Sequence, residues 1–175
     1  MLSRTFLWPQ GYTSAAMISV NLDAEFYGRI FYPGIDVSEG DIQRLGWTGM
    51  EYGLPHLLDC FREHGVKGTF FIPGRVAELY PDAVRAIADA GHELGCHGYE
   101  HEILAHFTPE EQLELLKKAK AAIEKAAGRA VTGFRMPEGE ITEQTLVAAK
   151  EAGFAYSSSL SDTDVPYIRQ PAGLP

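Results

Sequence analysis

The stretch that best indicates the fold is residues 91–101, GHELGCHGYEH. Gly91 follows an amphipathic helical pattern over 75–90 and is typical of a helix end. Residues 93–97 then form a short apolar run that finishes at a histidine, and a second histidine stands four positions later. The stretch therefore predicts a helix, a strand and a polar strand tip in succession, as in a parallel α/β unit.

The same succession continues in both directions along the chain. Short apolar runs predict further strands at 15–22, 68–72, 131–135 and 154–157. Longer patterns predict helices at 50–64, 75–90, 108–128 and 142–152. The third of these begins at TPEE, which supplies an N-cap, a Pro in the first turn and a capping-box Glu. We therefore expect an α/β fold on a parallel sheet, with its chemistry at the carboxyl ends of the strands.

Size and charge exclude several classes of function. With 175 residues, 45% of them hydrophobic, the chain is predicted to form one folded domain. A net charge of −9 without a stripe of Lys and Arg argues against a nucleic-acid partner. The sequence shows no signal peptide, no apolar run of membrane-spanning length and only two cysteines. We expect a cytoplasmic protein that has no membrane partner.

Two polar clusters at predicted strand tips carry ligand-type side chains. His97 and His101 can present both imidazoles to one ion if the chain turns helically after His97, and otherwise they pack or face solvent. Along the first strand, alternation places Asn21, Asp23 and Glu25 on one face. The alternative for this cluster is a loop-capping Asp followed by a surface Glu. An acid and two imidazoles with an open position are typical of a catalytic metal site.

A third cluster, GFRMPEGE at 133–140, closes the fourth strand. Arg135 at its tip either holds a carboxylate bidentately in a pocket or pairs with Glu138 or Glu140 at the surface. The Gly-rich and aromatic stretch 26–49 either faces a substrate or packs around a long loop. Four further histidines are predicted to have no catalytic role: His56, His64, His92 and His106.

The order of strand-tip acid, His-x-x-x-His and Arg-x-Pro resembles the first three motifs of the polysaccharide deacetylase (NodB homology, carbohydrate esterase family 4-like) superfamily. The match runs from about Met17 to Leu160, and FFIPG at 70–74 and the 91–101 stretch resemble the family most. The resemblance implies a distorted (β/α) barrel and hydrolysis of an acylated nitrogen. It also implies a divalent ion, zinc before cobalt, manganese or nickel, held by Asp23, His97 and His101.

This sequence departs from the family pattern at the first motif, which usually has two adjacent Asp residues, a catalytic base and then a metal ligand. Here Ala24 follows Asp23. We assign Asp23 to the metal, in a register like that of divergent members carrying Asp-x-Asp-Ala, so Asn21 occupies the position of the base. An amide cannot usefully accept a proton near neutral pH, and Glu25 therefore becomes the candidate base.

The family's late motifs, including a His proposed as general acid, are expected beyond the last residue. We therefore predict a single NodB-like catalytic domain over 1–175 that lacks its C-terminal strands and associates as a homo-oligomer. The predicted function is metal-dependent hydrolysis of non-peptide amide bonds, either deacylation of an N-acylated sugar or opening of a small amide or imide. The alternative is a catalytically weak protein of the same fold that binds metal and ligand.

Overall fold

The computed structural model describes residues 8–27, 39–139, 141–161 and 165–168. Its centre is a five-stranded sheet of β1 (Ser19–Asn21), β2 (Thr69–Ile72), β3 (Glu93–Cys96), β4 (Gly133–Phe134) and β5 (Tyr156–Ser157). Each strand pairs in parallel with the next one along the chain. This order is that of a (β/α) barrel, but within the described residues the sheet is not closed. The predicted α/β class and parallel sheet are confirmed.

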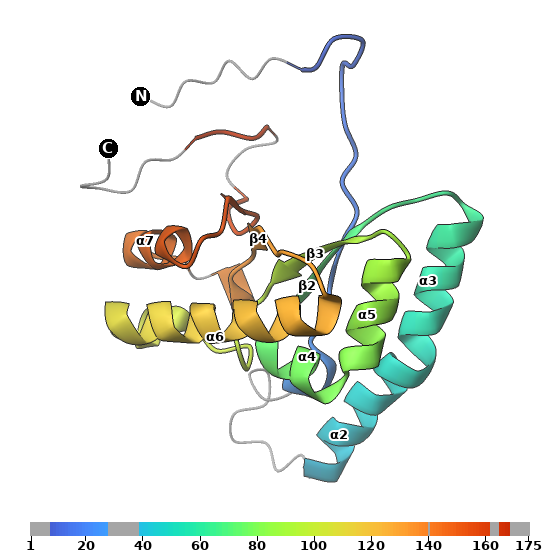
Figure 1. Ribbon diagram of the computed structural model, residues 1–175, viewed down its shortest axis with the longest axis horizontal. Coiled ribbons are helices and arrows are strands. Elements are labelled where there is room, and N and C mark those ends of the chain that lie inside the picture. The colour runs from blue at the N-terminus through green and yellow to red at the C-terminus, as the bar shows by residue number, and fades with distance from the viewer. Residues whose placement is uncertain (1–7, 28–38, 140, 162–164, 169–175) are drawn as a thin grey trace.

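Helices follow the strands and cover one face of the sheet (Figure 1). They are α2 (Glu39–Thr48), α3 (Leu54–Glu63), α4 (Gly74–Leu79), α5 (Pro81–Asp89), α6 (Pro109–Ala127) and α7 (Glu143–Glu151). A π-helical segment, η2 (Gly49–Gly53), joins α2 to α3, and 3-10 turns form η1 (Ala24–Phe26), η3 (Leu104–His106) and η4 (Pro137–Gly139). None of the helices in the described part of the chain combines the length and apolar character needed to cross a membrane.

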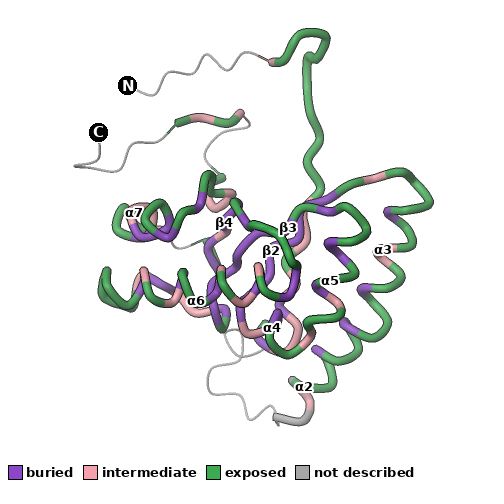
Figure 2. Tube along the Cα trace, in the orientation of Figure 1, coloured by how far each residue is buried: buried purple, intermediate pink, exposed green. Residues whose placement is uncertain are grey.

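The two faces of the sheet differ in character. Phe70, Ile72, Leu94 and Phe134 point to the helices and belong to one hydrophobic core, visible as buried trace through the centre of Figure 2. The opposite face carries Phe71, whose ring contacts the position where a Gly95 side chain would begin. Alternation along each strand thus assigns one face to packing and leaves the other for the site.

The helix predicted to begin at Met50 begins much earlier, because α2 and η2 precede α3 without a break. The glycines of this region suggested a loop, since glycine disfavours helix. In the structure Gly46 lets α2 approach η1 so closely that a Cβ would overlap the Glu25 backbone nitrogen. Packing therefore explains the glycine, and the expectation of a loop over 26–49 is wrong for 39–49. Residues 28–38 of that stretch lie outside the described residues.

Two other boundaries differ from the prediction. The helix predicted over 75–90 is two helices, because Tyr80 has a non-helical backbone (φ −127°, ψ 54°) and Pro81 starts α5. The first strand covers only Ser19–Asn21, since residues 9–18 are exposed and lead away from the sheet (Figure 1). The capping box at Thr108 and the left-handed Gly128 at the end of α6 are confirmed.

Candidate metal centre

Asp23, His97 and His101 come together at the carboxyl ends of β1 and β3. One ligand atom from each side chain lies within 4.8 Å of the other two, and no other such cluster occurs among the described residues. The three residues are buried, with exposed fractions of 9%, 1% and 2% respectively. Polar groups buried this deeply are normally hydrogen-bonded or coordinate a metal.

The loop from His97 to His101 turns in a way that the spacing did not predict. Gly98 and His101 have left-handed backbone conformations, with φ of 74° and 62°, and residues 97–101 are not helical. The Glu102 carboxylate accepts hydrogen bonds from the backbone nitrogens of Tyr99 and Glu100, at 2.9 and 2.5 Å. The two imidazoles therefore converge through a left-handed turn, and the predicted helical turn is wrong.

Distances within the cluster suit a shared ion. His97 Nε2 lies 3.7 Å from Asp23 Oδ1, and His101 Nε2 lies 3.7 Å from Asp23 Oδ2. Nitrogens and oxygens about 2.0–2.1 Å from a tetrahedral zinc are separated by roughly 3.3 Å, close to this spacing. Asp23 Oδ1 and His97 Nε2 are buried without a hydrogen-bond partner. Unpartnered lone pairs that face one another are what a divalent ion would satisfy.

A hydrogen bond at Nδ1 orients the His97 ring. Its Nδ1 lies 2.8 Å from the backbone oxygen of Arg135, to which an Nδ1–H donates. This bond leaves Nε2 with its lone pair toward Asp23, the arrangement found around metal-bound histidines. Since the acceptor is a backbone atom of the β4 tip, the position of His97 depends on the pairing of β3 with β4.

Burial sets the charges of the three groups. It lowers the pKa of His97 to about 4 and also lowers that of His101. Burial, assisted by the negative charge of Glu138, raises the pKa of Asp23 to about 7. Both imidazoles are therefore neutral at neutral pH, as a metal ligand must be. Asp23 is only partly ionised there, and an ion would displace its remaining proton.

Arg135 does not meet a carboxylate among the described residues. Its guanidinium packs on the Phe71 ring and donates to Asn21 Oδ1 at 2.9 Å and to Ser19 Oγ at 2.9 Å. It also donates to the backbone oxygen and hydroxyl of Ser158, at 3.2 and 2.7 Å. The side chain thus crosses the inner face of the sheet from β4 to β1 and β5. The prediction that it orients a carboxylate is not what this geometry shows.

Glu25 is also placed differently from the expectation. The strand ends at Asn21 and the chain turns through η1, so alternation no longer applies at Glu25. Its carboxylate accepts a hydrogen bond from the Tyr80 hydroxyl at 3.2 Å and does not line the cavity at the cluster. Asn21 does line that cavity.

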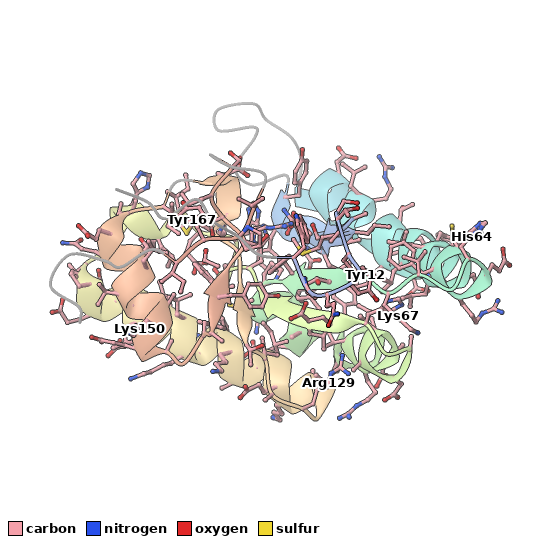
Figure 3. All side chains as sticks on the ribbon, turned by 90° about the horizontal axis from the view of Figure 1, so that it is seen from above. Tyr12, His64, Lys67, Arg129, Lys150 and Tyr167 are labelled. Atoms are coloured by element: carbon pink, nitrogen blue, oxygen red, sulfur yellow. The ribbon has the colours of Figure 1, made fainter. Side chains whose placement is uncertain are left out.

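The cavity beside the three ligands has a volume of about 250 Å³. Glu138, Ser158 and Ser159 also line it, and sequence reasoning gave none of them a role in the pocket. The signal for Glu138 was its place in the Arg-Met-Pro-Glu-Gly run at a strand tip. No residue pattern pointed to the serines. None of the other histidines lines the cavity, and His64 lies at the outer end of α3 (Figure 3).

Comparisons of this chain with known proteins all indicate the same family. The sequence model of polysaccharide deacetylase matches residues 47–157. The chain is 36% identical over 137 residues to a peptidoglycan deacetylase of Helicobacter pylori, covering 78% of this chain and 46% of that protein. It is 39% identical over 100 residues to a peptidoglycan-N-acetylglucosamine deacetylase of Bacillus cereus, covering 57% of this chain and 36% of that protein. The chain thus spans less than half the length of these relatives.

Solved structures agree with the sequence comparison. A Mycobacterium smegmatis protein described as a candidate polysaccharide deacetylase superposes with a TM-score of 0.83 at 34% identity, covering 94% of this chain and 58% of that one. A Bacillus anthracis protein described as a carbohydrate esterase family 4 pseudoenzyme superposes with a TM-score of 0.59 at 30% identity, covering 62% and 38%. With its strand order, its Asp-His-His cluster and these matches, the chain belongs to the polysaccharide deacetylase family.

Proposed function

We propose that this chain forms the metal-binding part of a hydrolase that removes the acyl group from an N-acylated sugar. The observation that carries the proposal is the cluster of Asp23, His97 and His101, whose buried and partly unpartnered ligand atoms open onto a polar cavity. A site of this kind has three protein ligands and room for water or substrate, which is typical of catalytic metal centres. The family relationship supports the same chemistry.

Zinc is the metal we propose, because two neutral imidazoles and one carboxylate suit a borderline cation. Such an ion would polarise the acyl oxygen and activate water near neutral pH. The chain's own contribution is orientation. The Arg135 backbone oxygen holds His97, and the Arg135 side chain engages Asn21 Oδ1, which leaves the Asn21 amide hydrogens for an acceptor in the cavity.

An N-acetylated sugar is the substrate class we favour. The relatives described above are named for the deacetylation of peptidoglycan and of its N-acetylglucosamine units. Asn21, Ser158 and Ser159 around the cavity offer donors and acceptors of the kind that bind hydroxyl groups. A small amide or imide substrate, a cytoplasmic location and a homo-oligomer stay predictions of the sequence.

A second candidate is a protein that binds metal and ligand but turns over weakly. Asn21 stands where the family's base is expected, and an amide does not accept a proton usefully. The Bacillus anthracis relative described as a pseudoenzyme, one mutant of which is described as having restored activity, gives this candidate a precedent. It predicts a loaded metal site with little acetate release.

Acetate release from N-acetylglucosamine oligomers and peptidoglycan, with zinc or cobalt added to the metal-free protein, tests the proposal. The wild type should release acetate, and a His97→Ala, His101→Ala double variant should not. His64→Ala is the matched control, because His64 is exposed at the end of α3 (Figure 3). Full metal occupancy without acetate release from any substrate would favour the binding protein instead.

A further inference from the structure

We propose that Glu138 is the catalytic residue that accepts a proton from the attacking water, the role left open at Asn21. The assignment rests on the proposed function and names the base for it. It concerns a carboxylate that lines the cavity from the turn after β4, whereas the family places its base at the tip of β1. The catalytic base of this chain would therefore stand at a different position from the base of the family pattern.

Neither Asn21, at the family's base position, nor Glu25, the base predicted from the sequence, fits the task. Asn21 has no basic atom, and its Oδ1 already accepts a hydrogen bond from Arg135 at 2.9 Å. The Glu25 carboxylate is turned toward the Tyr80 hydroxyl and lies outside the cavity lining. Among the described residues, the carboxylates that line the cavity are those of Asp23 and Glu138. Since Asp23 belongs to the ligand cluster, Glu138 is the described carboxylate available to act on water.

The position of Glu138 is close to the ligands but separate from them. It lines the same cavity as Asp23, His97 and His101, yet none of its atoms joins the group of ligand atoms within 4.8 Å of one another. A base needs this arrangement, because it must reach the water without occupying the ligand set.

The backbone at Glu138 is in a conformation that residues with a side chain rarely adopt. Its φ is 57° and ψ is 1°, and Gly139 after it has a φ of 74°. Within the described residues, three non-glycine positions have positive φ: Ala24, His101 and Glu138. Ala24 follows the ligand Asp23 and His101 is itself a ligand, so all three adjoin the metal centre. Such strain persists where the surrounding structure fixes it, commonly at active sites.

Contacts from neighbouring segments hold this turn in place. The Met136 backbone nitrogen donates to Ser159 Oγ at 2.9 Å, and the Gly139 nitrogen lies 3.4 Å from the Met136 oxygen. Pro137 and Met136 are buried, whereas Glu138 is exposed. The segment is therefore anchored on both sides of a charged side chain that keeps access to the cavity.

The reaction balances with Glu138 as the proton carrier. One O–H bond of water breaks, its proton passes to the Glu138 carboxylate, and the oxygen forms a bond to the acyl carbon. When the C–N bond breaks, the protonated Glu138 returns that proton to the leaving nitrogen. The products are an acid and an amine, and Glu138 ends ionised as it began.

Glu138→Gln tests the assignment, because it keeps the shape of the side chain and removes its basicity. We expect kcat to fall by about 10²–10⁴, the usual contribution of a general base, with little change in KM and full metal content. Glu114→Gln, an exposed position on α6, is the matched control and should keep wild-type turnover. Normal kcat in Glu138→Gln, with the loss found in Glu25→Gln or Glu140→Gln, would overturn the assignment.

Acetohydroxamate, a small chelator of divalent ions, supplies a readout independent of turnover. Glu138 would accept a hydrogen bond from its N–H or O–H, so calorimetry on zinc-loaded protein should show at least tenfold weaker binding to Glu138→Gln than to the wild type. Equal affinity would overturn the assignment. Wild-type protein that binds acetohydroxamate but releases no acetate would instead contradict the proposed function, and the affinity ratio would still test the position of Glu138.

Discussion

The two sides of the cavity differ in how their polar groups are satisfied. On the ligand side, Asp23 and His97 are buried and have atoms without a hydrogen-bond partner. On the open side, Asn21 and Glu138 are exposed, and Arg135 donates to oxygens on β1 and after β5. The polar atoms of the first side lack partners that an ion could supply, whereas the described polar groups of the second side have hydrogen bonds or face solvent. Substitutions on the two sides should therefore have separable effects.

The largest effect is expected from removing two ligands at once. A His97→Ala, His101→Ala double variant should lose stoichiometric zinc, because Asp23 alone cannot hold the ion and each ligand is worth at least about tenfold in affinity, roughly 1.4 kcal/mol. Elemental analysis after gel filtration measures this, with His64→Ala as the control. Full occupancy in the double variant would show that the ion binds elsewhere.

Asp23→Asn should stabilise the metal-free protein at pH 8. Asp23 has a folded pKa of about 7 against an ordinary value of 3.8, so its ionisation opposes folding increasingly as the pH rises from about 4 to 7. Removing the ionisable group should raise the free energy of unfolding by at most on the order of 4 kcal/mol at pH 8, and by less than about 1 kcal/mol near pH 4. Urea denaturation in chelator measures the difference, and a pH-independent difference would contradict the assigned burial.

Zinc affinity should fall about fiftyfold between pH 7 and pH 5, because the ion competes with one proton on Asp23 whose pKa is about 7. Above pH 7 the carboxylate is already ionised and affinity should level off with respect to this group. His97, with a pKa of about 4, should contribute only near the acid end. Competition with a chelator of known affinity measures the slope. Affinity that is constant down to pH 5 would contradict protonation of the ligand set.

The smallest effect is expected on the open side. Arg135→Lys keeps the positive charge but cannot reproduce the several bonds from one planar group to Asn21, Ser19 and Ser158. Turnover should fall by about tenfold, the effect of losing about 1.4 kcal/mol of orientation, while zinc content stays at the wild-type value. Parallel assays of acetate release and metal content test this. Loss of zinc in Arg135→Lys would show that the two sides are not separable.

The sequence predicted the parts of this molecule that depend on periodicity and order. The five strands and α6 with its capping box followed from apolar runs and TPEE. The family resemblance implied that Asp23 joins His97 and His101, which is consistent with the rule that parallel strands end at one edge. These features depend on local composition and on topology, both of which can be predicted from a single sequence.

The features that the sequence missed depend on two local turns and on one set of contacts between distant segments. The left-handed turn that brings His101 to Asp23 and His97 is held by Glu102, and no spacing rule indicates it. Glu25 does not line the cavity, because η1 ends the strand alternation before this residue. The Arg135 guanidinium donates hydrogen bonds to oxygens on β1 and after β5, more than 20 positions away along the chain in each direction. It meets no carboxylate among the described residues.

The most direct test of the account is a crystal structure of the chain with zinc, using anomalous scattering at the zinc edge to locate the ion. The account predicts one strong peak per chain, about 2.0–2.2 Å from a carboxylate oxygen of Asp23 and from one ring nitrogen each of His97 and His101. A peak held by other side chains, or no peak from protein that contains stoichiometric zinc, would contradict it.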